Sequence, residues 1–547
     1  MVVSSLHAGS RKIAALALIQ VNLTEIIKPS RLGENRYERI LVVVFYLCFF
    51  LFFSSGRLSG GDPNDQLKAA MLLTATGSPG TDAELDASAY NWVRSPGGRN
   101  YEAHDIGSIV LMLPSAFAGS LMRNASVEAW VEHPPFYIKT GAALTYAVAA
   151  ALGAYALFLL FGMFHPARTA FLLSLAFVTT TPFWAFSRCA FDVLGGAIGV
   201  CMLLYTSTRV LLLERIATRD IVLSFASLAV VSSFRYSLMP FMGLSFLCVL
   251  WLRRKSLSWK CIGAGAAVFV CLMFPTFVYN FIRMGSPLRP ATVAAKYLNG
   301  MNALTGNPLS GLLGMLLSPN WGMVFYSPEF LLLAALPFMR KQLPWSELRM
   351  AVIWGLGALL YLVPVSCSVN WHGVVGWGSR YMVPVLPIFF LLLTFVMSLL
   401  WSHRKRLICG FIGISFLLNV PPALVNWHEA TLNYVTVPWP QQIRYHWAYA
   451  PRQQIALWNG LIGGLQGKPL PASPVWYADP VLNSIVAFPD LWTFRLMRLS
   501  KAGLLAGASL TAALLATMMA AAIRIFRNDT SDASRKRFAQ GVSAEMS

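Results

Sequence analysis

Residues 381–428 read YMVPVLPIFFLLLTFVMSLLWSHRKRLICGFIGISFLLNVPPALVNWH. The runs 381–403 and 407–428 contain no Asp, Glu, Lys or Arg, and each is longer than the ~20 residues with which a helix crosses a bilayer. Between them stands the basic cluster Arg404, Lys405 and Arg406, which is typical of a short cytoplasmic turn. The stretch therefore predicts two transmembrane helices joined on the cytoplasmic side.

The rest of the chain has the same character. Further runs without charged residues cover 140–167, 350–379 and 502–523. Of the 547 residues, 56% are apolar and only 12% are charged, against ~25% charged in a soluble domain. This composition excludes a soluble globule, a disordered chain and a disulfide-stapled secreted domain. We predict an all-α polytopic membrane protein.

The formal net charge of +20 raises the question of nucleic acid binding. The basic residues, however, gather in short clusters between apolar runs, at 253–260, 340–341, 404–406 and 524–537. This distribution is the one that cytoplasmic loops of membrane proteins follow, so the charge indicates orientation and not a nucleic acid partner. The eight cysteines show no spacing typical of metal ligands.

Placing every basic cluster inside predicts about twelve transmembrane helices and puts both termini in the cytoplasm. The spans lie near residues 40–55, 138–162, 168–186, 190–208, 220–234, 236–252, 261–281, 325–339, 350–367, 382–401, 407–426 and 501–523. The inside segments then hold 25 basic and 9 acidic residues, and the remainder holds 18 and 14, which supports the orientation. We assign 106–122 to a helix on the outer surface, because a further span there would put the later basic clusters outside.

This layout divides the chain into five parts. They are a cytoplasmic lead (1–39), a transmembrane core (40–426), a C-terminal outer segment (427–500), a last transmembrane helix (501–523) and a cytoplasmic tail (524–547). The lead has no small-residue cleavage site after a short apolar core, so we expect it to be retained. The core carries long outer loops at 56–137 and 282–324, where we expect interfacial helices. Because function concentrates in such loops, the site is expected on the outer, periplasmic face of the inner membrane.

The first candidate catalytic residue, Asp62, follows the first span within GGDPND (60–65). Gly60, Gly61 and Pro63 favour a turn there. A carboxylate at the membrane surface could act as general base for an acceptor hydroxyl. The alternative is a helix cap before Gln66, which we favour for Asp65 but not for Asp62.

The second candidate catalytic residue is Asp192, in SRCAFD (187–192). Arg188 stands four residues before it, so the two would share one helix face at the outer mouth of the bundle. Charge near membrane depth is costly and tends to line a site, although a self-contained ion pair is an equal alternative. Asp62 and Asp192 are also candidate ligands for a divalent cation, whose presence the sequence leaves open.

Two lone arginines, Arg235 and Arg380, stand at other outer mouths. Arginine binds phosphate in bidentate fashion and stays charged, so both are candidates for binding a substrate phosphate. The alternative for each is an ordinary contact with lipid headgroups.

Several neighbouring side chains could complete a binding site. Trp371, Trp377 and Tyr381 flank Arg380 and could form an aromatic shelf for a sugar or lipid, with an interfacial aromatic belt as the alternative. His104 in EAHDIG and Lys139 in HPPFYIKT are further candidates, each weak when taken alone.

The order of these motifs resembles the GT-C superfamily of membrane glycosyltransferases, which includes protein O-mannosyltransferases, aminoarabinose transferases and mycobacterial arabinofuranosyltransferases. The resemblance covers the topology of most of 38–425. It is carried by GGDPND, YEAHDIG, HPPFY, SRCAFD, NFIRMGSP, LSPNWGMVFYSP and WGSRYMVPVLP, all on the predicted outer side.

The resemblance implies an inverting hexosyl- or pentosyltransferase. It would move a sugar from a polyprenyl-phosphate carrier to a hydroxyl of an envelope glycan, lipid or protein. Asp62 would deprotonate the acceptor, and Asp192 would support the base, the acceptor or a metal. The departing phosphate would be held by Arg188, Arg380, His104 and Lys139. Pro63 stands where the O-mannosyltransferases have a second acid, which favours a glycan or lipid acceptor.

Two other functions remain open. A transporter or flippase of a lipid-linked sugar would place ionisable residues in mid-span around a central cavity, whereas most charges outside the predicted loops fall at outer mouths. An O-antigen polymerase or ligase would resemble the chain in having a long outer loop. In that class the functional residues are usually arginine and histidine in late loops, and not an acid directly after the first span.

Overall fold

The structure is a computed structural model. It describes residues 36–545 except 60, 83–90, 125, 189, 291–303, 320, 369–370, 372, 374–376, 428–448 and 468–487. Most of the predicted lead and large parts of 282–324 and 427–500 therefore lie outside the described residues.

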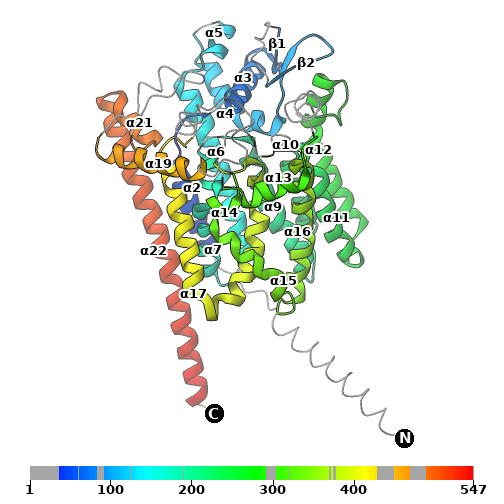
Figure 1. The fold of residues 1–547 in the computed structure, drawn as a ribbon, viewed down its shortest axis with the longest axis vertical. Coiled ribbons are helices and arrows are strands. Elements are labelled where there is room, and N and C mark those ends of the chain that lie inside the picture. The colour runs from blue at the N-terminus through cyan, green and yellow to red at the C-terminus, as the bar shows by residue number, and fades with distance from the viewer. Residues whose placement is uncertain are drawn as a thin grey trace.

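Apolar helices form a bundle that is covered at one end by a polar cap (Figure 1). A helical element lies over each of the twelve predicted spans. These elements are α2 (Arg36–Phe53), α6 (Phe136–Phe161), α7 (Ala167–Thr180), α9 (Asp192–Leu212), α10 (Thr218–Phe234), α11 (Met239–Arg253), α12 (Trp259–Met284), η4 (Pro328–Ala335) with α15 (Leu336–Met339), α16 (Trp345–Ser366), the two arms of α17 (Leu386–Leu424) and α22 (Lys501–Glu545).

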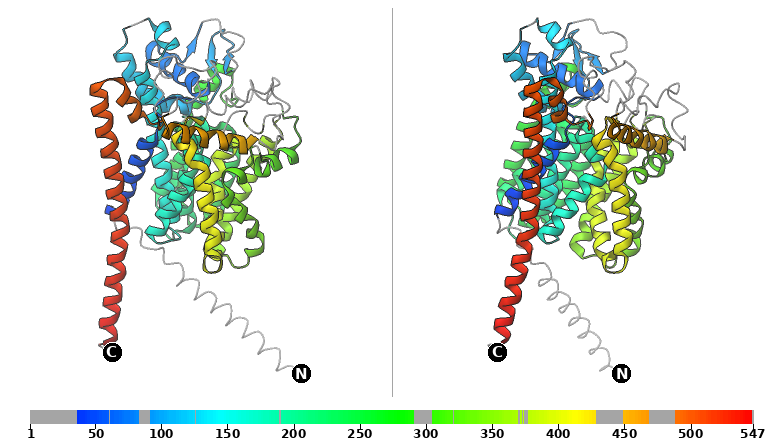
Figure 2. Two further views of the ribbon diagram at one scale, coloured as in Figure 1. Left: turned by 60° about the vertical axis from the view of Figure 1, so that its left-hand side comes forward. Right: turned by 90° about the vertical axis from the view of Figure 1, so that its left-hand side faces the viewer.

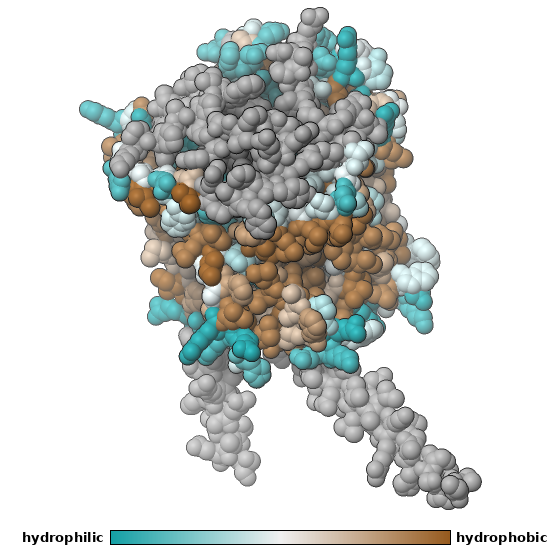
Figure 3. Space-filling view, in the orientation of Figure 1, coloured by the Kyte–Doolittle hydropathy of each residue, from teal (hydrophilic) through white to brown (hydrophobic). Residues whose placement is uncertain are grey.

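The described residues include seven helices that are long and apolar enough to cross a membrane. On the face shown in Figure 3, apolar side chains form a band across the middle of the bundle, and polar side chains gather along its lower edge and at the top of the cap. On α12, Phe274 is 63% exposed, as expected of a side chain that faces lipid. The helical multi-pass membrane class is thus confirmed, while the count of twelve spans stays a prediction.

The stretch 381–428 folds as its charge pattern predicts. After the short helix η5 (Arg380–Val385), α17 departs from helical geometry at Arg404 (φ −130°, ψ 24°) within the basic cluster. Figure 2 shows its two arms joined at the end of the bundle towards which α22 extends, opposite the polar cap. We call the opposite end of the bundle, which carries the polar cap, the capped end.

The cap is built mainly from the predicted outer loop 56–137. It contains α3 (Gly61–Thr76), β1 (Gly80–Thr81), β2 (Trp92–Arg94), β3 (Asn100–Glu102), α4 (Ile106–Leu121) and α5 (Val127–Glu132). The strands form a small antiparallel sheet in the order β1-β3-β2, in which Val93 pairs with Tyr101. This sheet corrects the all-α prediction. It also brings Asn91 and Glu102 towards the first turn of α3.

The predicted helix at 106–122 is present as α4 (Ile106–Leu121). Gly107, Met112 and Gly119 are buried against the bundle, while Phe117 and Leu121 are exposed. An apolar outer face of this kind suits the surface of a membrane. It agrees with the predicted interfacial position of α4, which stays a prediction.

Short elements complete the chain. They are α8 (Pro182–Ser187), η1 (Tyr236–Leu238), η2 (Arg254–Ser256), α13 (Pro308–Leu317), α14 (Met323–Tyr326), α19 (Tyr449–Leu465) and α21 (Trp492–Leu499). The last two lie near the capped end in Figure 1, and α21 leads into α22, which packs against α2. The C-terminal part of the chain therefore returns to the first described helix.

Candidate active site

Asp62 lies in the first turn of α3, which begins at Gly61 and not at Gln66 as predicted. Its side chain is buried, and a helix N-terminus favours its ionised form. Its Oδ2 accepts a hydrogen bond from Nη1 of Arg380 at 3.0 Å, and its Oδ1 accepts one from Asn91 at 3.1 Å. Asp65 accepts from the same Asn91 at 2.9 Å, and burial raises the pKa of Asp65.

Asp192 occupies the corresponding place at the start of α9. Its Oδ2 accepts a hydrogen bond from Nη1 of Arg235 at 3.0 Å. The guanidinium of Arg235 lies 5.1 Å from the ring centre of Tyr381, and that of Arg380 lies 5.5 Å from the same ring. Tyr381 therefore joins two ion pairs, Asp62–Arg380 and Asp192–Arg235, into one group that we call the ion-pair cluster.

The backbone around Arg380 is shaped to fit its side chain. Gly373 has a φ of +80°, and a Cβ on this glycine would stand 2.3 Å from Cγ of Arg380. Any larger residue would collide with the arginine stem and adopt a strained backbone. The Nε of Arg380 is buried and has no hydrogen-bond partner among the described residues. A buried donor without a protein partner is costly, which suggests that a ligand completes the site.

His104 lies between two carboxylates. Its Nε2 is 3.4 Å from Oδ2 of Asp62, and its Nδ1 is hydrogen-bonded to Oε1 of Glu102. The backbone N–H of His104 also donates to Oε2 of Glu102 at 2.9 Å. Both side chains are almost fully buried, at 2% and 0% exposed. A histidine flanked by two carboxylates is poorly suited to bind phosphate, the role that the resemblance implies for it.

Sequence reasoning missed Glu102 and Arg283. Arg283, near the end of α12, donates to the carbonyl oxygens of Glu102 and His104, each at 2.8 Å, and so fixes this backbone. The available signal was the spacing of EAH (102–104), because residues two apart in an extended strand share one side. Nothing local in the sequence links Arg283 to these residues.

Asp105 follows directly and is also buried. Its Oδ2 accepts a hydrogen bond from the backbone N–H of Tyr236 at 2.8 Å. Burial raises the pKa of Asp105 to about 6. Oδ1 of Asp105 has no partner among the described residues, so this carboxyl group is less well satisfied than Asp62.

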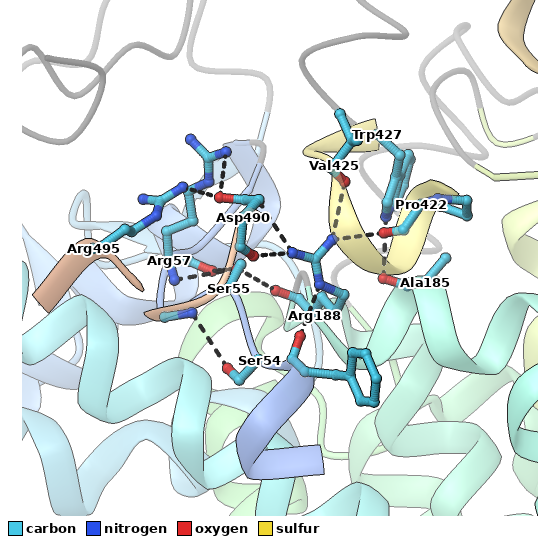
Figure 4. A network of polar contacts seen from close by, with 12 residues as sticks. Ser54, Ser55, Arg57, Ala185, Arg188, Pro422, Val425, Trp427, Asp490 and Arg495 are labelled. Atoms are coloured by element: carbon cyan, nitrogen blue, oxygen red, sulfur yellow. Dashed lines mark hydrogen bonds and ion pairs between the residues drawn. The ribbon is translucent and has the colours of Figure 1, made fainter. Parts of the chain in front are cut away.

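Arg188 takes part in a different network at the capped end (Figure 4). Its Nε donates to the carbonyl of Phe53 at 2.9 Å, and its Nη1 donates to Pro422 at 2.6 Å and Val425 at 3.0 Å. Its Nη2 donates to the backbone oxygen of Asp490 and, at 3.2 Å, to the carboxylate of the same residue. These contacts use all five donors of the guanidinium, so none is left for a substrate phosphate.

Asp490 is the centre of this second network, which we call the Asp490 cluster. Its carboxylate contacts Arg495, Nη2 of Arg57 at 3.1 Å and Nη2 of Arg188 at 3.2 Å. Burial alone would raise the pKa of Asp490, but the three arginines hold it well below its ordinary value. Its backbone N–H donates to Leu424 at 2.8 Å. The cluster thus ties the segment before α21 to the capped ends of α2 and α17.

The remaining predicted binding residues lie in different places in the fold. Trp377 is fully buried, and its Nε1 donates to Asn419 at 3.0 Å, inside the bundle. Trp371 is buried against Gly314 of α13. Lys139 is partly buried in the first turn of α6. Of the proposed aromatic shelf, Tyr381 contacts the guanidinium groups of the ion-pair cluster.

The carboxylates that could hold a divalent cation are engaged otherwise. Asp62 and Asp192 each face an arginine at 3.0 Å, and a guanidinium repels a dication. Within the described part of the chain, no group of three or more His, Cys, Asp or Glu residues could hold a metal ion. The residues in place therefore do not fit a metal, and no step proposed below uses one.

No family model matches the chain, and no curated protein matches it. Among solved structures, it is similar to ArnT from Cupriavidus metallidurans bound to undecaprenyl phosphate, at 15% identity and a TM-score of 0.44, over 88% of this chain and 77% of that one.

The chain is also similar to the Archaeoglobus fulgidus oligosaccharyltransferase AglB in complex with an inhibitory peptide and a dolichol-phosphate. The identity is 11% and the TM-score 0.39, over 81% of this chain and 61% of that one. A structure of the same enzyme with Zn and sulfate matches at 12% identity and a TM-score of 0.37, over 80% and 58%. At these values the similarities do not decide what this chain does.

Proposed function

We propose that the chain is an integral membrane glycosyltransferase that moves a sugar from a polyprenyl-phosphate carrier to a hydroxyl group with inversion. The observation that carries this proposal is the pair of Asp62 and Arg380. It combines a buried carboxylate at a helix N-terminus with an arginine whose buried Nε has no partner among the described residues. The motifs that resemble the GT-C superfamily support the same assignment.

Asp62 acts as the general base in this proposal. The acceptor hydroxyl attacks the anomeric carbon while its proton passes to the Asp62 carboxylate. Inversion follows because one in-line displacement occurs on the face opposite the phosphate, as in single-step inverting glycosidases. The hydrogen bonds from Arg380 and Asn91 hold the carboxylate in place for this step.

Arg380 and Arg235 stabilise the departing phosphate. The charge on the polyprenyl phosphate grows as the bond to the sugar breaks, and cations already in position lower the barrier. Asp192 fixes Arg235 at 3.0 Å, and the ring of Tyr381 lies against both guanidinium groups. In this proposal Arg188 has no part in the chemistry, since the Asp490 cluster uses its donors.

The proposed membrane layout has twelve spans, with the capped end outside. Both termini then lie in the cytoplasm of a cell with an inner membrane, and the ion-pair cluster faces the periplasm. The basic turn at Arg404 and the opposite position of the cap support this orientation (Figure 2). The donor is a hexosyl or pentosyl polyprenyl phosphate, and the acceptor is an envelope glycan, lipid or protein.

The test is transfer by membrane vesicles supplied with radiolabelled polyprenyl-phosphate sugars. We expect Asp62→Asn to lower transfer by about 10²–10⁴-fold, the range typical of a lost general base. Asp65→Asn is the matched control, because Asp65 lies on the same helix and binds the same Asn91. An Asp62→Asn protein that transfers sugar as well as the control does would refute the assignment of the base.

A flippase of lipid-linked sugars is the second candidate, and Glu329 is the observation in its favour. This carboxylate is fully buried within η4 and accepts hydrogen bonds from Thr180, at 2.8 Å, and from Ser415. An acid inside a membrane bundle is often functional. If the chain is a flippase, Glu329→Gln abolishes movement of a fluorescent lipid-linked sugar across vesicles; if it is a transferase, the same variant keeps sugar transfer.

A further inference from the structure

The residues around His104 carry an inference that rests on the proposed transfer reaction. Three buried groups lie in a row, the carboxylate of Glu102, the imidazole of His104 and the carboxylate of Asp62. They come from the end of β3, the loop after it and the start of α3. Two residues of the row, Glu102 and His104, have no role in the displacement step described above.

The two sides of the imidazole differ. Nδ1 is hydrogen-bonded to Oε1 of Glu102, whereas Nε2 stays 3.4 Å from Oδ2 of Asp62. A charge-assisted hydrogen bond between ionised groups is about 2.7–2.9 Å long, so the wider gap argues against an imidazolium bound to Asp62. The asymmetry favours a neutral ring with its proton on Nδ1 and a lone pair on Nε2. Arg380 already compensates the charge of Asp62 at 3.0 Å.

The surroundings hold this arrangement firmly. Oε2 of Glu102 accepts from the backbone N–H of His104 at 2.9 Å, which fixes the carboxylate to the loop that carries the ring. Arg283 donates to both backbone carbonyls at 2.8 Å, and Tyr279 donates to that of Glu102 at 3.0 Å. A carboxylate bound to Nδ1 selects one tautomer and stabilises the ring when its other nitrogen takes a proton.

We propose that Glu102, His104 and Asp62 form a proton relay in which Nε2 of His104 accepts the proton that Asp62 takes from the acceptor hydroxyl. The acceptor O–H bond breaks, the proton moves to Asp62 and then to Nε2, and Asp62 returns to its ionised form. The electron pair of the broken sugar–phosphate bond leaves with the polyprenyl phosphate. Glu102 balances the imidazolium, which releases its proton to water after the products depart.

The relay assigns different roles to its members. Asp62 touches the acceptor, His104 holds the proton, and Glu102 is a positioning residue that acts through His104. The charged groups facing the row are Arg380 beside Asp62, Asp65 behind Asn91 and Arg283 behind the backbone. In this proposal the hydrogen bond between Nδ1 of His104 and Oε1 of Glu102 sets the tautomer.

The decisive experiment needs no substrate. Purified full-length protein labelled with ¹⁵N-histidine is examined by NMR at neutral pH, and the His104 signals are assigned from His104→Asn. We expect Nδ1 to be protonated and Nε2 unprotonated, and we expect Glu102→Gln to remove this preference while Asp65→Asn leaves it. A ring protonated on Nε2 in the wild type, or a tautomer indifferent to Glu102→Gln, would overturn the relay. So would a His104 signal that moves when metal is removed by a chelator.

A kinetic measurement complements the spectrum. We expect His104→Ala to lower kcat about 10–100-fold and added imidazole to restore part of it, while Asp62→Asn is not restored. Melting temperatures within a few degrees of the wild type show that the variants are folded. Full activity of His104→Asn, which can still donate to Glu102, overturns the relay but leaves Asp62 as base. A wild type that transfers no sugar contradicts the proposed function. The NMR experiment needs no transfer, so it tests the tautomer of His104 and its dependence on Glu102 independently of that function.

Discussion

Asp62 and Asp490 are both buried carboxylates at the capped end of the bundle, and both contact arginine, yet their surroundings differ. Asp490 lies among Arg57, Arg188 and Arg495, and Arg188 spends all five donors on protein oxygens. Oδ2 of Asp62 lies 3.0 Å from Nη1 of Arg380 and 3.4 Å from Nε2 of His104. Nε of Arg380 lacks a partner among the described residues. The guanidinium of Arg188 is thus used up in holding chain segments together, whereas that of Arg380 keeps a donor with which it could receive a substrate.

The largest effect on stability is expected from Asp490→Ala. Removing this carboxylate leaves several buried guanidinium groups uncompensated, which typically costs about 3–5 kcal/mol. We expect the free energy of unfolding in detergent, measured by thermal or denaturant melting, to fall by that amount. Asp82→Ala is the control, since Asp82 is 77% exposed and its pair with Arg99 is worth roughly 0–1 kcal/mol. Equal losses in the two variants would remove the distinction between the clusters.

Matched lysine substitutions sharpen the comparison. Arg188→Lys reduces five donors to three and should lower the free energy of unfolding by about 2 kcal/mol, because buried carbonyls lose partners. Arg380→Lys keeps the charge beside Asp62 and should cost little stability but about tenfold or more in transfer. Melting curves measure the free energy of unfolding, and the vesicle assay measures the rate of sugar transfer. The distinction between the two clusters is wrong if both substitutions lower stability alone or transfer alone.

The smallest effect concerns Asp105, a third buried carboxyl group. Its pKa of about 6 lies above the ~3.9 of an unfolded chain, so the folded state binds more protons and stability falls as pH rises from about 4 to 6. Asp105→Asn removes this loss and should raise the free energy of unfolding at pH 8 by about 1–2 kcal/mol. Below pH 4 the variant and wild type should melt alike. A gain that is independent of pH would contradict the role of burial.

Much of the bundle follows from local sequence. Charge-free runs give the helix positions, and the basic cluster at Arg404 marks the turn in α17 because such clusters resist transfer across a membrane. The small sheet in the cap was missed, since strands of two or three residues give too short an alternation to detect.

The candidate site was predictable in part. Asp62, Asp192, Arg235 and Arg380 stand out because lone charges beside apolar runs are rare. Their pairing was not predictable: Arg188 was expected to share a helix face with Asp192, but it bonds to Asp490, 302 positions away in the chain. Such contacts depend on how the helices pack, which spacing within one segment cannot reveal. Glu102 was overlooked although its spacing from His104 within EAH offered a local signal.

The long separation within the Asp490 cluster has a consequence for biosynthesis. Every helix of the core precedes residue 427 in the chain, yet Asp490, which joins the ends of α2 and α17, is synthesised only later. Domains form as the chain emerges, so the first helix must wait for the last segment before its capped end is secured. At that end the carbonyl oxygen of Ser54, directly after α2, also accepts a hydrogen bond from the backbone N–H of Trp492 at 3.0 Å. Chains released before Asp490 should therefore reach the membrane with the capped ends of α2 and α17 unjoined, and be recognised by quality-control proteases.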